Sequence, residues 1–116
     1  MKSVLIVDDQ AEMIEVLQAL IEDAELFSPV YTASSALEAL NLIKDKKIDV
    51  IISDHKMPKH TGEWLAREVS LLEDSQNISF HIMTGYPNLV KTNFIKYGIK
   101  SLLRKPLSEE DLKKVS

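Results

Sequence analysis

The sequence predicts an α/β protein built on a doubly wound parallel sheet. Short apolar runs such as Val4-Leu5-Ile6-Val7 alternate with longer segments in which apolar residues recur every three to four positions. A near-continuous apolar run suits a strand buried on both faces, and strands that alternate with helices favour parallel pairing. The alternation repeats along the whole chain, so we expect five β-α units.

The expected strands are the ranges richest in apolar and β-branched residues: Ser3–Asp8, Val30–Thr32, Ile48–Ser53, Ile78–Thr84 and Ser101–Arg104. The helices expected between them each carry one apolar face: Ala11–Ala24, Ser35–Lys46, Gly62–Leu72 and Asn88–Tyr97. Ser34 or Ser35 is a suitable cap for the second helix, and Gly98 is a suitable end for the fourth. Ser108-Glu109-Glu110-Asp111 is typical of the start of a fifth helix.

Composition narrows the class of protein. The chain has 116 residues, of which 45% are hydrophobic, and this suits one domain with a sizeable core. It has no cysteine, which excludes disulfides and thiolate zinc sites. No apolar run approaches the ~20 residues of a membrane span, and Asp8 and Asp9 interrupt the amino-terminal run too early for a signal peptide.

We therefore expect a soluble cytoplasmic protein that associates with no membrane. The net charge of -4 gives no reason to expect nucleic-acid binding by this domain. The last helix is short for packing against a sheet, so we expect residues 1–116 to form one domain, with a truncated final helix, cut from a longer protein.

Charged and polar residues follow the expected strands. Ligands of open α/β sheets bind beyond the carboxyl ends of the strands. Here Asp8 and Asp9 follow the first strand and Asp54 follows the third, while Thr84 ends the fourth and Lys105 follows the fifth. Clustered carboxylates repel one another unless a cation joins them, and oxygen ligands favour a hard ion such as Mg²⁺. Lys and Thr opposite the acids suit an anion, so the pattern indicates a site for a phosphoryl group beside Mg²⁺.

The set "VDD", "ISDHKMP" with Gly62 downstream, "MTG" and "LRKP" resembles the receiver domain of bacterial two-component response regulators, over nearly the whole chain. The resemblance implies a flavodoxin-like fold with strand order 2-1-3-4-5. It also implies that Asp54 is the phospho-acceptor. Asp9 would bind Mg²⁺ directly and Asp8 mostly through water, with Asp54 and the backbone carbonyl of Lys56 as further ligands.

The same resemblance assigns the remaining site residues and the partners. Thr84 would hydrogen-bond one phosphoryl oxygen and Lys105 would pair with another, and the bond before Pro106 is commonly cis in the family. The phosphoryl donor would be the phosphohistidine of a histidine kinase or phosphotransfer protein, or a small phosphodonor. The domain would assist its own phosphorylation and dephosphorylation but serve mainly as a switch. Its output would act on an attached domain or a second copy through the face formed by helix four, strand five and helix five.

The sequence departs from the family pattern at one position. Receiver domains often have an aromatic residue three positions before the lysine, and this chain has Leu102 there. We therefore expect output to run mainly through the loop Gly85-Tyr86-Pro87 and the start of helix four, and strand five to respond little. Two other functions remain open: a degenerate receiver that acts as a constitutive protein-interaction module, and an α/β phosphatase with an Asp nucleophile. The phosphatase needs a second acid near the nucleophile, whereas His55-Lys56-Met57 follows Asp54.

Several residues also have simpler interpretations. Asp8-Asp9 alone is compatible with a helix cap, and His55 and His60 with ordinary loop positions rather than metal ligands. His81 interrupts an apolar strand, and we expect it to be buried, neutral and hydrogen-bonded. Trp64 is expected to pack at the start of the third helix.

Overall fold

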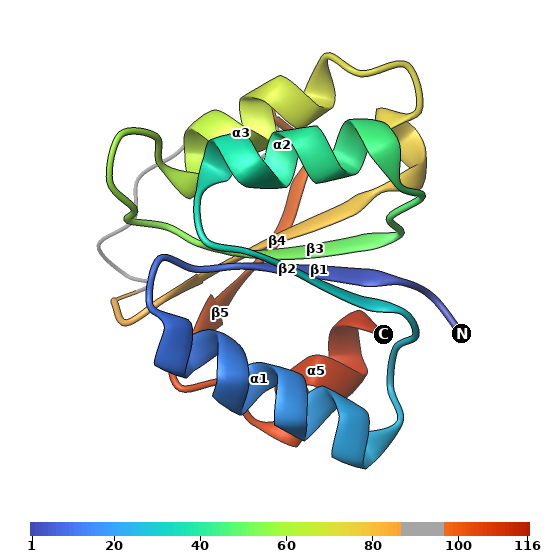
Figure 1. Cartoon of the computed structure of the whole chain (residues 1–116), viewed down its shortest axis with the longest axis vertical. Helices are drawn as coiled ribbons and strands as arrows, with labels where there is room; N and C mark the ends of the chain where they lie inside the picture. The colour runs from blue at the N-terminus through green and yellow to red at the C-terminus, as the bar shows by residue number, and fades with distance from the viewer. Residues whose placement is uncertain (87–96) are drawn as a thin grey trace.

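A five-stranded parallel sheet lies between two layers of helices (Figure 1). The computed structural model describes residues 1–86 and 97–116. The helix expected at 88–97 therefore lies, apart from Tyr97, outside the described residues. Helices α2 (Ala36–Asp45) and α3 (Gly62–Ser70) cover one face of the sheet, and α1 (Ala11–Ala24) and α5 (Glu109–Val115) cover the other.

The strand order confirms the predicted fold. The strands are β1 (Val4–Val7), β2 (Val30–Ala33), β3 (Val50–Asp54), β4 (Ser79–Thr84) and β5 (Ile99–Arg104). They pair in the order β2-β1-β3-β4-β5, and every neighbouring pair is parallel. The chain reverses its direction of winding between β1 and β3, and such a switch point is where open α/β sheets bind ligands.

All five strands differ from their expected limits by one or two residues, and β3 and β5 each begin two residues away from the expected start. β3 begins at Val50 rather than Ile48, because Asp49 directs its amide and carboxylate to Ser3 instead of extending the ladder to β1. β5 begins at Ile99 rather than Ser101. Ile99 pairs with Phe80 and is buried, and a register shift then aligns His81 with Ser101 and leaves Lys100 as a bulge.

Serine and threonine side chains fix the start of three helices. The Ser35 hydroxyl accepts a hydrogen bond from the Glu38 amide, and the Thr61 hydroxyl accepts one from the Trp64 amide. Ser108 and Asp111 form a reciprocal capping box at the start of α5. A short 3₁₀ helix, η1 (Ser75–Asn77), connects α3 to β4.

The core has two halves, one on each face of the sheet. Because strand side chains alternate between faces, Leu5, Ile51 and Ile82 pack under α2 and α3. Their neighbours Ile6, Ile52 and Met83 pack over α1 and α5. Removing a fully buried Leu or Ile side chain typically costs about 2–5 kcal/mol. These apolar layers give the polar edge of the sheet a rigid support.

No helix among the described residues has both the length and the apolar character needed to cross a lipid bilayer.

Candidate functional site

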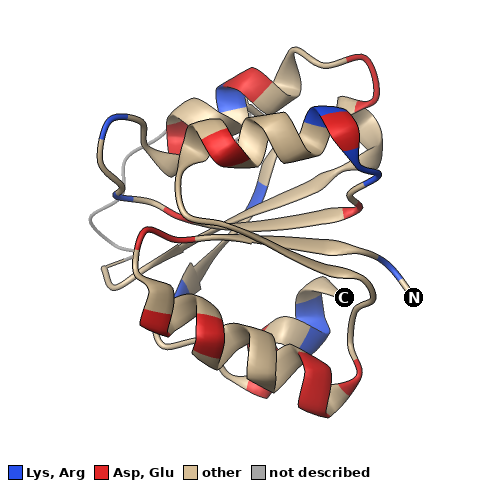
Figure 2. Ribbon diagram, viewed as in Figure 1, with Lys and Arg blue, Asp and Glu red and all other residues tan. Residues whose placement is uncertain are grey.

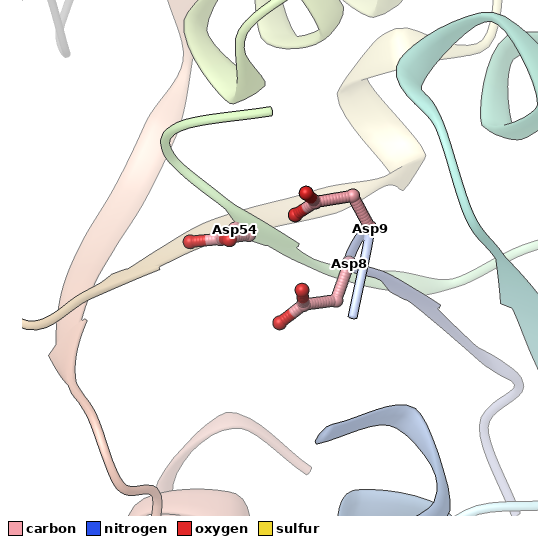
Figure 3. Close-up of side chains that lie close together, drawn as sticks. All are labelled: Asp8, Asp9 and Asp54. Carbon is pink, nitrogen blue, oxygen red and sulfur yellow. The ribbon is translucent and has the colours of Figure 1, made fainter. Parts of the chain in front are cut away.

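Three carboxylates meet at the carboxyl edge of the sheet. Asp8 and Asp9 directly follow β1, and Asp54 is the last residue of the adjacent strand β3. Their side chains project to the same side of the strands (Figure 3), and one oxygen of each lies within 4.8 Å of the others. Asp8 and Asp54 are buried, whereas Asp9 is exposed. The predicted cluster of acids is therefore assembled by the fold.

Asp8 has too few partners to offset its burial. Its Oδ1 accepts a hydrogen bond from the Gln10 amide at 2.9 Å, and its Oδ2 lies 3.4 Å from Lys105 Nζ. Burial nevertheless raises the pKa of Asp8, and the negative charge of Asp54 raises it further. A cation bound at this site would offset the electrostatic cost of keeping the Asp8 carboxylate charged and buried. The donors are all carboxylate oxygens, so they fit a hard divalent ion such as Mg²⁺.

Lys105 lies opposite the acids, directly after β5. Its Nζ is 3.0 Å from Asp54 Oδ1, and its amide donates to the Thr84 carbonyl at 2.8 Å. Burial acts to lower the pKa of Lys105, but the hydrogen bond to Asp54 and the charges of Asp54 and Asp8 outweigh it and raise the pKa. The ammonium therefore stays charged beside the carboxylates. The peptide bond from Lys105 to Pro106 is cis.

A pocket of about 300 Å³ opens beside Asp54. It is lined by residues from the ends of three strands: Asp54, His55, Lys56, Thr84, Gly85, Tyr86 and Lys105. The Thr84 hydroxyl accepts a hydrogen bond from the Tyr86 amide at 3.2 Å, while the Tyr86 side chain is largely exposed. The pocket offers a carboxylate, an ammonium and a hydroxyl to one small anionic group.

The backbone around Asp54 is tightly packed. The start of α3 lies so close that a Cβ added to Gly62 would be 2.3 Å from the Asp54 carbonyl oxygen. Only glycine fits at this approach. In the loop before α3, the His60 ring stacks on Trp64 with centroids 3.8 Å apart. This contact agrees with the packing role expected of Trp64, and its partner is visible only in the structure.

The fold brings together all the predicted side chains. Asp8, Asp9, Asp54, Thr84 and Lys105 surround one edge, and Lys56 lines the same pocket. Sequence reasoning missed Ser53, whose buried hydroxyl bonds the Asp54 carbonyl, and it treated His55 as an ordinary loop residue although it lines the pocket.

His81 and Leu102 lie elsewhere in the sheet. His81 Nδ1 is 2.6 Å from Ser101 Oγ, and burial lowers the pKa of His81 to about 4, as the expected neutral ring requires. Leu102 is half-buried on β5 and packs against the core under α2 and α3.

Charge is unevenly distributed around the site. Acidic residues are spaced along α1, which contains no lysine or arginine (Figure 2). The loop between β3 and α3 carries basic residues instead, among them the exposed Lys56 and Lys59. An open parallel sheet with clustered acids, a lysine and a threonine at its switch point defines a class of small signalling domain that handles phosphoryl groups beside a divalent ion.

Comparison with known proteins identifies the family within that class. The family model for the response regulator receiver domain matches residues 4–116, and the chain therefore belongs to this family, the receivers of two-component signal transduction. It is 30% identical to the two-component response regulator ARR14 of Arabidopsis thaliana over 97% of this chain and 29% of that protein.

Solved structures agree with this assignment. A response regulator receiver domain from Clostridium thermocellum superimposes with a TM-score of 0.85 at 30% identity, covering 99% of this chain and 90% of that one. The receiver domain of the sensor histidine kinase PA1611 from Pseudomonas aeruginosa, which has a magnesium ion coordinated in its active-site cleft, gives a TM-score of 0.85 at 20% identity, with 98% and 93% covered.

The curated relatives are much longer than the match. The chain spans 29% to 45% of the length of those it resembles. Receiver domains act with histidine kinases and output domains.

Proposed function

We propose that this domain accepts a phosphoryl group on Asp54 in a Mg²⁺-dependent reaction and thereby switches a signalling surface. The single observation that carries the proposal is the contact of 3.0 Å between Lys105 Nζ and Asp54 Oδ1 at the edge of the three-acid cluster. A carboxylate buried for a structural reason alone would explain neither the lysine nor the two further acids. A nucleophile that must meet an anionic phosphoryl group needs both positive charge and a metal site.

The proposed donor is the phosphohistidine of a histidine kinase or phosphotransfer protein, which implies a cytoplasmic location. One Asp54 oxygen forms a bond to phosphorus while the bond from phosphorus to the donor's imidazole nitrogen breaks. That nitrogen keeps the bonding electrons and takes up a proton from solvent. Small phosphodonors transfer by the same exchange at phosphorus. Later attack by water returns Asp54 and releases phosphate.

Each polar residue of the pocket has a proposed role. Asp9 would bind Mg²⁺ directly and Asp8 mostly through water, with Asp54 and the Lys56 carbonyl as further ligands. When bound, the ion supplies charge neutralisation at the transferring phosphoryl group. Thr84 donates its hydroxyl to one phosphoryl oxygen, and Lys105 pairs with another.

The output of the switch is proposed to act on an attached output domain or on a second copy of the chain, through the face that includes β5 and α5. The Thr84 hydroxyl accepts a hydrogen bond from the Tyr86 amide. Movement of that hydroxyl toward a phosphoryl oxygen would therefore release the loop at Gly85-Tyr86. Leu102 favours a second candidate, a receiver that binds its partner constitutively. It replaces the aromatic side chain whose rotation commonly signals phosphorylation in the family.

Phosphate incorporation from acetyl phosphate distinguishes these candidates. We expect wild-type protein with Mg²⁺ to gain one base-labile phosphate by mass spectrometry, and Asp54→Asn to gain none, because the amide keeps the shape but loses the attacking charge. Asp49→Asn is the matched control, a carboxylate at the opposite edge of the sheet, and should label normally. Wild-type protein that takes up no phosphate, or Asp54→Asn that labels at the wild-type rate, contradicts the proposal.

A further inference from the structure

Ser53 is a buried polar residue that the site described above does not use. It lies in β3 between Ile52 and Asp54, and its side chain is completely shielded from solvent. A hydroxyl in such a place needs a partner, because an unpaired buried hydroxyl costs about 1–3 kcal/mol. Its partner is the main-chain carbonyl oxygen of Asp54, to which Ser53 Oγ donates at 3.0 Å.

That carbonyl belongs to the same rigid peptide unit as the His55 amide. The His55 N–H points to two acceptors, Asp54 Oδ1 at 2.9 Å and the Met83 carbonyl oxygen on β4 at 3.1 Å. Because the peptide unit is planar, a donor that holds its C=O end also fixes the direction of its N–H end. A hydrogen bond to the carbonyl also polarises the amide and strengthens it as a donor.

The start of α3 also crowds this carbonyl. A Cβ at Gly62 would lie 2.3 Å from the Asp54 carbonyl oxygen and 3.2 Å from Ser53 Oγ, and the Gly62 amide donates to the His55 carbonyl at 2.8 Å. The Asp54 carbonyl is therefore in close contact with both the Ser53 hydroxyl and the backbone at Gly62. The peptide has little freedom to tilt.

We propose that Ser53 is a positioning residue for phosphoryl transfer: its hydroxyl fixes the Asp54–His55 peptide so that the His55 amide holds Asp54 Oδ1 and sets the rotation of the nucleophilic carboxylate. Oδ1 is also the oxygen that Lys105 contacts at 3.0 Å. Two donors on one oxygen, one from the backbone and one from across the pocket, define a single orientation of the group. The inference rests on the proposed function of Asp54, but the hydrogen bonds that carry it need neither phosphate nor metal.

Ser53→Ala tests the inference through two measurements. In metal-free protein, the His55 amide proton should move upfield in the NMR spectrum, because its bond to the carboxylate weakens. In saturating Mg²⁺ and acetyl phosphate, the maximal phosphorylation rate should fall about fivefold, the scale of one lost hydrogen bond. The acetyl phosphate concentration that gives half of that rate should change less than twofold, since the groups that bind the anion remain. Ser53→Cys, which keeps a weak donor, should fall between.

Ser3→Ala is the matched control. Ser3 is also buried, and it bonds the Lys47 carbonyl and Asp49 at the opposite edge of the sheet. It should lower stability at least as much as Ser53→Ala while leaving the His55 resonance and the phosphorylation rate unchanged. An unmoved His55 amide in both Ser53 variants, or an equal loss of rate in Ser3→Ala, overturns the positioning role. Absence of phosphorylation in wild-type protein would instead refute the proposed function, and the metal-free spectrum would still decide the inference.

Discussion

The two edges of the sheet hold carboxylates in opposite conditions. At the amino edge, Asp49 accepts the Ser3 amide at 2.9 Å and the Ser3 hydroxyl at 3.2 Å, and the backbone bond lowers the pKa of Asp49. At the carboxyl edge, burial and the nearby Asp54 raise the pKa of Asp8. The chain itself supplies the partners that Asp49 needs. Asp8 is left with an electrostatic cost that a cation would remove, and this difference separates a structural carboxylate from a functional one.

Among the variants that distinguish the two edges, Asp9→Ala should have the largest effect, because it removes a proposed direct Mg²⁺ ligand from the carboxyl edge only. We expect the affinity for Mg²⁺, measured by calorimetry, to fall at least about a hundredfold. The gain in unfolding free energy that the ion gives wild-type protein at 100 times its dissociation constant, about 2.7 kcal/mol, should disappear. Asp49→Asn should keep both the wild-type affinity for Mg²⁺ and the stabilisation that the ion provides. Unchanged Mg²⁺ affinity in Asp9→Ala would refute the assignment of the site.

His81 is a buried ionisable group within β4, away from both edges. Its pKa is about 4 in the folded chain against 6.5 in the unfolded one, so between these values the unfolded chain binds a proton that the folded chain does not. Acidification from pH 7.5 to pH 5 should therefore cost about 2 kcal/mol of stability through this group.

His81→Gln, which keeps a hydrogen-bonding group near Ser101, should remove that component when chemical denaturation is followed across the same pH range. An identical pH dependence in the variant and the wild type would show that His81 does not contribute.

Asparagine substitutions test the two edges directly. In metal-free protein at pH 7, Asp8→Asn should stabilise the fold, because it removes a charge that burial disfavours. Asp49→Asn should destabilise the fold, because it removes a charge that Ser3 stabilises. Urea unfolding of both variants measures the sign of each change in the free energy of unfolding. Equal signs would mean that the contrast between the edges is wrong.

The smallest expected effect concerns the structural change that phosphorylation of Asp54 produces beyond the site. With beryllofluoride as a phosphoryl mimic, amide shifts should change most at Gly85 and Tyr86, because the hydrogen bond from the Tyr86 amide to Thr84 Oγ1 is expected to break. They should change least at Leu102. Leucine has no ring to rotate and no hydroxyl to exchange partners. Two-dimensional NMR with and without the mimic measures both regions. Large changes confined to β5, with a silent Gly85-Tyr86 segment, would contradict this route.

Sequence reasoning predicted the order of the elements because it depends on periodic patterns. α1 was predicted at Ala11–Ala24 and lies there, since its apolar face is continuous. The start of β5 was missed, because Gly98 and Lys100 flank Ile99 and conceal a strand that begins with a bulge. The limits of β3 depend on a hydrogen bond between Asp49 and Ser3, which are 46 positions apart, and no local pattern reports such a partner.

The same distinction applies to the site. The acids, Thr84 and Lys105 were predicted as a group because each directly follows or ends an apolar strand, and the topology brings strand ends together. Their functional roles remain predictions. Ser53 could not be found in this way, because a serine inside an apolar run looks like a neutral strand residue. Its importance comes from the close approach of Gly62, which depends on the three-dimensional packing of α3.

The stacked rings of His60 and Trp64 give the protein an intrinsic optical probe. Trp64 is the sole tryptophan of the chain, so all tryptophan emission comes from the segment that follows Asp54. An imidazole ring in face-to-face contact with an indole quenches its fluorescence, and more strongly when it is protonated. Any ligand that shifts the loop between β3 and α3 will alter that overlap and change the emission intensity. If the proposed binding of Mg²⁺ or of a phosphoryl mimic shifts this loop, it can be followed in unlabelled protein, in real time.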